Sequence, residues 1–123
     1  MTAKITTEKR KQITNLTKNV LMEFKGLTEL EFQFIYDLSC SDFAFECGVQ
    51  DGIGGYVNSN EGFDMSRVRG VMSSLIQKGY IQVDDAIFGE TWVVVTDMEI
   101  TEAIFAMWYP SLITLETIVT EVA

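Results

Sequence analysis

The sequence predicts a small α+β domain that is mainly helical. Three observations lead to this fold class. Apolar residues recur at spacings of three and four in several segments, two short segments have the pattern of a β-hairpin, and capping signals precede the helical segments. With 123 residues, 47% of them apolar, the chain is long enough to form one domain with its own core.

Two helices are expected in the first third of the chain. The first covers residues 7–24 and stops at Gly26, because glycine is the preferred residue just after a helix. The second starts at Thr28, whose hydroxyl forms a capping box with the carboxylate of Glu31. The apolar positions expected to face the core are Ile13, Leu16, Val20 and Phe24 in the first helix and Leu30, Phe34, Ile35 and Leu38 in the second.

The segment 40–63 is predicted to be mostly loop, because glycine and asparagine are frequent in it. It also carries aromatic and apolar residues that a fully solvated loop would not normally have. Part of it is therefore expected to pack on the body of the domain, either as a short helix or as a short strand around Tyr56 and Val57.

A third helix is predicted from an N-cap at Asp64 to Lys78, and Gly79 closes it. It is amphipathic, so one side should face the core and the other should face solvent. The apolar side contains Met65, Val68, Val71, Met72, Leu75 and Ile76. The polar side contains Ser66, Arg67, Arg69, Gly70, Ser73, Ser74, Gln77 and Lys78.

A hairpin and a fourth helix complete the pattern. Residues 80–84 and 91–95 read as two strands around a turn or wing at residues 85–90. Thr96 is expected to cap the last helix, whose apolar positions run to Trp108 before Pro110 breaks the pattern. The tail 111–122 suits a helix, although its β-branched content would also suit a strand.

The charge of the chain is strongly acidic but unevenly placed. Eighteen acidic residues and nine basic ones give a net charge of −9. The bases lie in residues 1–25 and 64–79, whereas residues 26–63 and 80–123 contain no lysine or arginine. Net negative charge disfavours contact with phosphates, but a segregated basic surface can still bind an anion. The alternative is that these bases only lie on solvent-exposed helix faces and bind nothing.

Several function classes find no support in the sequence. The chain has no histidine, and the spacing of Cys40 and Cys47 matches no zinc or redox motif, so no metal, cofactor or histidine-based catalysis is expected. No glycine-rich phosphate loop or nucleophile elbow supports an enzyme. The polar start lacks the core of a signal peptide and no apolar run has the length of a membrane span, which predicts a soluble, cytoplasmic protein.

Residues 66–96 resemble a known family. Residues 68–81 (VRGVMSSLIQKGYI) are similar to the recognition helix and following strand of MarR-like regulators, and residues 93–96 (VVVT) resemble the join after the wing in that family. The resemblance implies a winged helix-turn-helix over residues 28–107, with a two-stranded wing and flanking N- and C-terminal helices in a single domain. The arrangement is also similar to small uncharacterised winged-helix proteins of phages and plasmids.

Two features depart from the MarR-like pattern. The wing segment 84–90 has no base, where the family usually offers an arginine to the minor groove. The segment 40–63 is longer and more apolar than the turn expected before a recognition helix. A wing without bases should be repelled by phosphate.

The first functional hypothesis is a DNA-binding transcription regulator that contacts double-stranded DNA through the polar side of the third helix. Arginine can read guanine edges or hold phosphates, and serine and glutamine can contact either. The alternative is that Arg67 and Arg69 are only solvated or pair with acidic residues of the same domain. The candidate contacts are Ser66, Arg67, Arg69, Ser73, Ser74, Gln77 and Lys78, with Lys9, Arg10 and Lys11 as further phosphate contacts.

The second hypothesis is a protein-interaction module that binds a host factor or imitates DNA, without binding DNA itself. The acidic wing and the net charge favour it. Ile87 and Phe88 at the wing tip are the candidate partner contacts, unless they fold back onto the body. Under either hypothesis the terminal helices could form a homodimer. Met107, Trp108, Tyr109 and Leu112 are the candidate dimer contacts, and they could equally close the core of the monomer.

Overall fold

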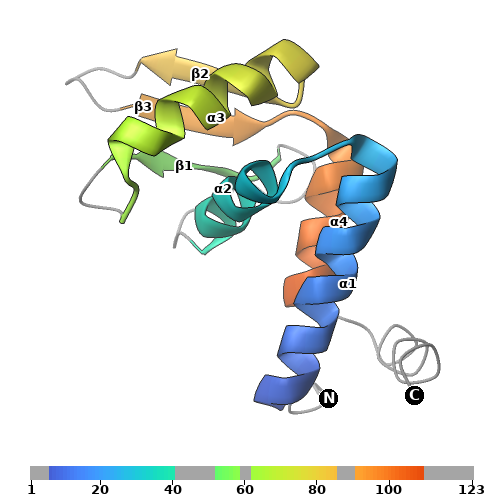
Figure 1. Cartoon of the computed structure of the whole chain (residues 1–123). Coiled ribbons are helices and arrows are strands. Elements are labelled where there is room, and N and C mark those ends of the chain that lie inside the picture. Colours follow the sequence, from blue (N-terminus) through green and yellow to red (C-terminus); the bar gives the residue numbers. More distant parts are fainter. Residues whose placement is uncertain (1–5, 41–51, 59–61, 86–90, 110–123) are drawn as a thin grey trace.

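The computed structural model describes residues 6–40, 52–58, 62–85 and 91–109, which form four helices and three strands (Figure 1). In chain order these are α1 (Thr7–Lys25), α2 (Glu29–Ser39), β1 (Gly54–Val57), α3 (Met65–Lys78), β2 (Ile81–Asp85), β3 (Thr91–Val95) and α4 (Met98–Trp108). The predicted α+β class with mainly helical content is confirmed for these residues. The predicted turn 85–90 starts one residue later, because Asp85 belongs to β2. Residues 86–90 of that turn, the tail 111–122 and Cys47 lie outside the described residues.

Local capping explains where the helices begin and end. The capping box of α2 is present, since the Glu31 amide donates to the Thr28 hydroxyl over 3.1 Å and the Thr28 amide donates to the Glu31 carboxylate over 2.8 Å. α1 ends at Gly26 and α3 at Gly79, with φ angles of 67° and 77° that disfavour residues with a side chain. These predicted starts and stops are confirmed.

The strands form one antiparallel sheet in the order β1-β3-β2. The predicted two-stranded hairpin is therefore joined by a third strand, so of the short helix and the short strand predicted as alternatives for this segment, the strand around Tyr56 is the one that forms. β1 pairs with β3, with Gly54 opposite Val94. A Cβ atom on Gly54 would lie 2.6 Å from the ring of Trp92, so the close packing of this strand on the indole requires glycine.

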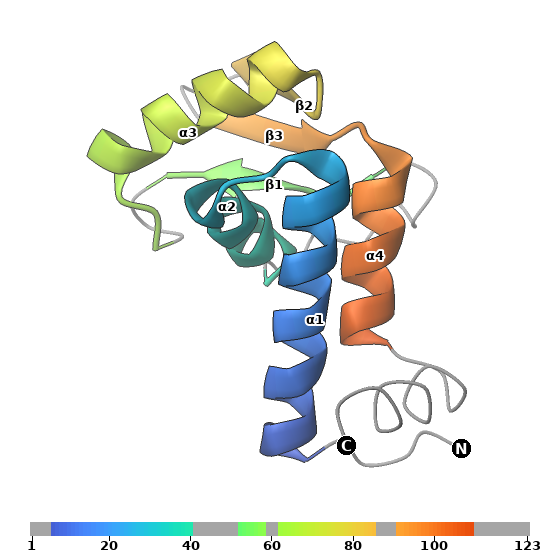
Figure 2. The same cartoon turned by 45° about the vertical axis from the view of Figure 1, so that its right-hand side comes forward.

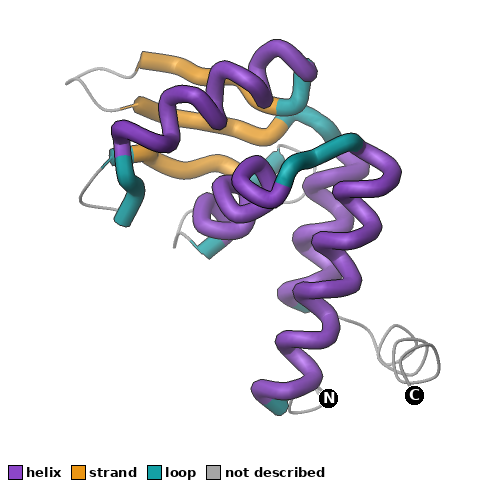
Figure 3. Tube along the Cα trace, viewed as in Figure 1, coloured by secondary structure: helices purple, strands orange, loops and turns teal. Residues whose placement is uncertain are grey.

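The helices are distributed unevenly around the sheet. α3 lies across the sheet beside β2 and β3, and α2 lies on the side of β1 (Figures 1 and 3). α1 and α4 run side by side and extend away from the sheet, which both views of the cartoon show (Figure 2). α2 thus contacts both β1 of the sheet and α1 of this helix pair.

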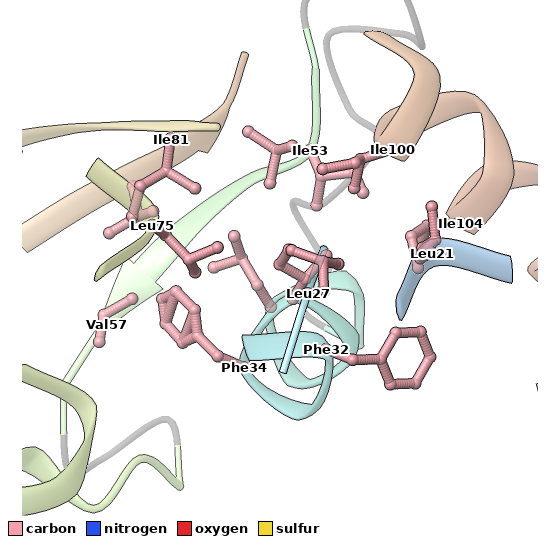
Figure 4. Close-up of a cluster of buried hydrophobic side chains, with 14 of the residues drawn as sticks. Leu21, Leu27, Phe32, Phe34, Ile53, Val57, Leu75, Ile81, Ile100 and Ile104 are labelled. Carbon is pink, nitrogen blue, oxygen red and sulfur yellow. The ribbon is translucent and has the colours of Figure 1, made fainter. Parts of the chain in front are cut away.

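One hydrophobic core joins these layers (Figure 4). Along β3 the burial alternates as expected for a strand with one covered face, because Val93 and Val95 are buried whereas Trp92 and Val94 are half-buried. Each helix adds side chains to the same cluster. The labelled members are Leu21, Leu27, Phe32, Phe34, Ile53, Val57, Leu75, Ile81, Ile100 and Ile104.

The predicted core face of α1 is partly wrong. Ile13 is buried as expected, but Val20 and Phe24 are 47% and 76% exposed, and Leu21 is buried instead. Leu30 of α2, which is 54% exposed, also lies outside the core. Helical periodicity defines an apolar face, but the position of the neighbouring helices decides which edge of that face they cover.

The predicted cap of α4 is wrong by one residue. Asp97, not Thr96, is the N-cap, and its carboxylate accepts from the Ile100 amide over 2.9 Å. Thr96 still belongs to the sheet connection, because its amide donates to the Tyr80 carbonyl over 2.9 Å. Both residues are good caps in isolation, and the bond between the Thr96 amide and Tyr80 keeps Thr96 in the sheet connection, so that Asp97 becomes the cap.

Candidate nucleic-acid interface

Helix α3 carries most of the predicted contact residues and is held to the body on one side only. Its N-cap is Asp64, and its buried side chains are those of Val68 and Leu75. The opposite side points away from the sheet and from α2 (Figure 1). We call this surface the α3 outer face, and it consists of Ser66, Arg69, Gly70, Ser73 and Gln77, all of them exposed.

Most of the polar side chains on the α3 outer face make no contact that stabilises the fold. Within the described residues, the side chains of Arg69, Ser73 and Gln77 have no hydrogen-bond or ion-pair partner. The Ser66 hydroxyl donates to the Asp64 carboxylate over 2.7 Å, as part of the cap. These groups are therefore available for hydrogen bonds to another molecule.

Arg67 is exposed but lies toward α2 rather than on the outer face. It lines a hollow of about 190 Å³ between α2 and α3, together with Asp64 and the apolar side chains of Phe34 and Val68. The hydrogen bond from the Ser66 hydroxyl is the main reason why the pKa of Asp64 is lowered, and the nearby Arg67 charge lowers it further. The Asp64 charge in turn offsets part of the positive potential at this end of α3.

Two of the predicted contact residues on α3 have a structural role instead. The Ser74 hydroxyl donates to the carboxylate of Glu31 in α2. The Lys78 ammonium donates to the same carboxylate over 2.6 Å and to the Gly26 carbonyl over 2.8 Å. These bonds fix α3 to the start of α2.

Glu31 is the buried centre of this arrangement, with 1% of its surface exposed. Burial alone would raise the pKa of its carboxyl group. The hydrogen bonds from Lys78, Ser74 and the Thr28 amide outweigh burial, so the pKa of Glu31 is lowered from its ordinary value. The carboxylate is therefore charged at neutral pH. The sequence identified Glu31 only as a capping residue, because no local pattern indicates that α3 would cover it.

The predicted phosphate contacts in the first turns of α1, Lys9, Arg10 and Lys11, lie far from the α3 outer face. The first turns of α1 are at one end of the molecule and α3 is at the other, in both views (Figures 1 and 2). Arg10 points inward, where its guanidinium donates to the Met107 carbonyl over 2.7 Å and lies 5.2 Å from the Trp108 ring. Lys9 and Lys11 are exposed. On the described residues, these three side chains and the α3 outer face therefore do not form one continuous basic surface.

The candidate dimer contacts on α4 are partly used within the monomer. Met107 is buried, and the Trp108 indole donates to the Ser39 hydroxyl over 2.9 Å while stacking on Tyr36 at 5.6 Å. Both side chains thus close the core of the monomer. Tyr109 is 63% exposed, and Leu112 lies outside the described residues.

The hairpin beside α3 is acidic where it is described. Asp84 is exposed on β2, and no lysine or arginine follows it in the sequence. The candidate partner contacts Ile87 and Phe88 lie outside the described residues. Cys40 is a free, exposed thiol.

No protein-family model, characterised protein or solved structure shows significant similarity to the chain. Among the described residues, no helix combines the length and the apolar character needed to cross a lipid bilayer.

Proposed function

We propose that this protein is a DNA-binding domain of the winged-helix type that places the α3 outer face in the major groove. The observation that carries the proposal is the composition of this face, which offers one arginine, two serines and one glutamine in exposed positions. These are side chains that contact base edges and phosphates. The order of α2, α3, the β2–β3 hairpin and α4 supports the winged-helix comparison.

Gly70 in the middle of the α3 outer face also supports a binding role. A Cβ atom there would meet nothing within 4 Å, so no described part of the fold requires glycine at this position. Glycine in a helix interior costs about 1 kcal/mol relative to alanine. A close approach by another molecule is a physical reason for retaining it.

One topological feature departs from a helix-turn-helix. Only residues 58–64 separate β1 from α3, so the element directly before α3 is a strand. The helix that supports α3 is α2, through Glu31. In the proposed complex α2 therefore takes the position of the supporting helix, with β1 inserted between the two helices along the chain.

The proposed complex depends little on phosphate contacts. Of the bases on α3, Lys78 is paired with Glu31, which leaves Arg69 on the α3 outer face and the exposed Arg67 on the neighbouring side toward α2. Each phosphate neutralised adds about −0.9 to the slope of log K against log salt concentration. We expect a slope of about −2, shallow for a specific DNA-binding protein.

A protein-interaction module without DNA binding is the second candidate, and the charge distribution favours it. Lys18, Lys25 and Lys78 each pair with acidic side chains of the same chain, and Asp84 faces solvent beside α3. An acidic surface of this kind complements a basic protein better than it complements a phosphate backbone.

The deciding experiment compares two double variants with the same change of charge. Arg67→Glu with Arg69→Glu alters α3, and Lys9→Glu with Lys11→Glu alters the distant end of α1. Binding sites are first selected from a random pool of duplex DNA with the wild-type protein. The α3 variant should then lose at least about a hundredfold in affinity, and the α1 variant should bind within a few-fold of wild type.

Two outcomes would contradict the DNA-binding proposal. One is that the pool yields no enriched sequence at low salt. The other is that both double variants lose affinity equally, because a general charge effect would then explain the binding.

A further inference from the structure

Strand β2 forms an open edge of the sheet. In the order β1-β3-β2 it pairs only with β3 among the described residues. The Thr96 amide donates to the Tyr80 carbonyl, so this carbonyl points toward β3, whereas the Tyr80 amide donates to the Leu75 carbonyl at the end of α3. Because these groups alternate along an antiparallel strand, Gln82 and Asp84 also face β3. The amide and carbonyl groups of Ile81 and Val83 then point away from the sheet.

The pairing on the other side of β3 gives the same alternation. The Val95 amide donates to the Ile53 carbonyl over 2.8 Å, so Val95 and Val93 direct their backbone groups toward β1. Trp92 and Val94 are left to pair with Asp84 and Gln82 of β2, which agrees with the register. Two independent hydrogen bonds thus indicate that the backbone groups of Ile81 and Val83 point away from β3, where no strand of the described residues pairs with them.

There is open space beside this edge. A hollow of about 570 Å³ is lined by Ile76 of α3, by residues 81–84 of β2 and by Trp92 and Val94 of β3. Ile76 is 48% exposed although it belongs to the apolar side of its helix. The opposite edge of the sheet, β1, is flanked by α2 (Figure 1). β2 is therefore the edge at which another strand could be added.

The side chains along β2 differ between the two faces of the sheet. Ile81 and Val83 point toward the face covered by α3, where Ile76 lies. Gln82 and Asp84 are exposed on the other face, and residues 80–123 contain no base that could neutralise Asp84 locally. A strand added here would place alternate side chains beside the apolar side chain of Ile76 and beside the carboxylate of Asp84.

We propose that the free edge of β2 binds an extended segment of a partner protein by strand addition, and that this segment alternates apolar and basic residues. The backbone groups of Ile81 and Val83 supply main-chain hydrogen bonds, and Ile76 and Asp84 select the side chains. A second copy of this chain fits less well, because two acidic β2 strands would be brought together. The inference does not depend on DNA binding by α3.

Amide hydrogen exchange measured by NMR tests the proposal. The probe is a capped peptide of about six residues that alternates valine and lysine. The matched control peptide alternates valine and glutamate. The lysine peptide should slow the exchange of the Ile81 and Val83 amides, whereas the Gln82 and Asp84 amides are already protected by β3. Exchange at Ile81 and Val83 that is slow without peptide, or unchanged by millimolar lysine peptide, would overturn the proposal.

Two variants examine the hydrogen bonds and the charge separately. Val83→Pro removes an outward amide without removing a bond to β3, so it should weaken peptide binding roughly tenfold. Val83→Thr keeps the amide and should bind the peptide like wild type. Asp84→Lys should reverse the preference, so that the glutamate peptide binds more tightly than the lysine peptide. If Val83→Pro fails to fold, the reversal at the exposed Asp84 decides alone.

Two further results bear on the identity of the partner. Protection of Ile81 and Val83 that rises with protein concentration in the absence of peptide would assign the edge to a second copy and overturn the partner proposed here. The Arg67→Glu, Arg69→Glu protein should bind the lysine peptide like wild type. A large change in peptide affinity in that protein, in either direction, would place the peptide on α3 instead of β2.

Discussion

The Lys78 ammonium lies 2.6 Å from a carboxylate oxygen of Glu31, and this contact joins the end of α3 to the first turn of α2. The same carboxylate accepts hydrogen bonds from the Ser74 hydroxyl and the Thr28 amide. Glu31 is buried, whereas Lys78 reaches solvent. Loss of the contact would therefore leave the Glu31 charge buried without its partner, whereas the Lys78 charge could still be solvated. The orientation of the α3 outer face follows from this contact.

Glu31→Gln should lower the free energy of unfolding by about 2 kcal/mol, because the buried site loses its charge-assisted bonds to Lys78 and Ser74. Glu29→Gln is the matched control. Glu29 pairs with Lys18 over 2.9 Å but is 70% exposed, so its loss should cost at most about 0.5 kcal/mol. Urea unfolding followed by circular dichroism measures both. Equal effects would show that burial of Glu31 does not strengthen its contacts.

Stability should fall in acid, partly because of Glu31. Its pKa is lowered in the folded protein from the ordinary value of 4.5, so the unfolded chain binds this proton more readily. The stabilisation is fully present above the ordinary pKa and is lost as the pH falls through the folded-state pKa. Between pH 7 and pH 2 the free energy of unfolding should fall less for Glu31→Gln than for wild type. An equal fall in both proteins would show that Glu31 does not contribute to the acid sensitivity.

Gly70→Ala should raise the free energy of unfolding by about 0.5–1 kcal/mol, since the new methyl group enters open space in a helix interior. If the α3 outer face binds DNA closely, the same change should weaken binding to the selected DNA. Gly26→Ala is the contrasting control, because the φ angle of 67° should make it destabilising by about 1 kcal/mol. Thermal unfolding and DNA titration together separate stability from binding. A variant that is more stable and binds normally would remove Gly70 from the interface.

Asp97→Ala should destabilise the protein by about 1–2 kcal/mol, because α4 loses its N-cap. Thr96→Ala should cost less than about 0.5 kcal/mol, since the Thr96 hydroxyl makes only a 3.4 Å contact with the Gly79 carbonyl. Asp97 also accepts from the Lys25 ammonium over 3.1 Å, and Lys25→Met isolates that contribution. Denaturant midpoints of the three variants give the comparison. If Thr96→Ala lost more stability than Asp97→Ala, Thr96 would be the N-cap, as the sequence predicts.

The sequence alone determined the helices and the hairpin, because their signals are local. Thr28 and Glu31 form a capping box within one helical turn, and glycines at positions 26 and 79 permit the backbone reversals. The β-branched and aromatic residues at positions 91–95 likewise predict a strand without reference to the rest of the chain. The division of the bases into two segments was also visible in the sequence, because it requires only counting.

Only the tertiary structure decided which side chains of α3 remain available. Ser74, Lys78 and Arg69 are all polar residues on one amphipathic helix, and nothing in their spacing separates them. The first two lie within reach of Glu31, which comes from more than forty residues earlier in the chain, and Arg69 does not. In the same way, neighbouring helices cover Leu21 and leave Phe24 exposed. Periodicity gives each helix a face, but long-range packing decides which residues of that face are covered and which can bind another molecule.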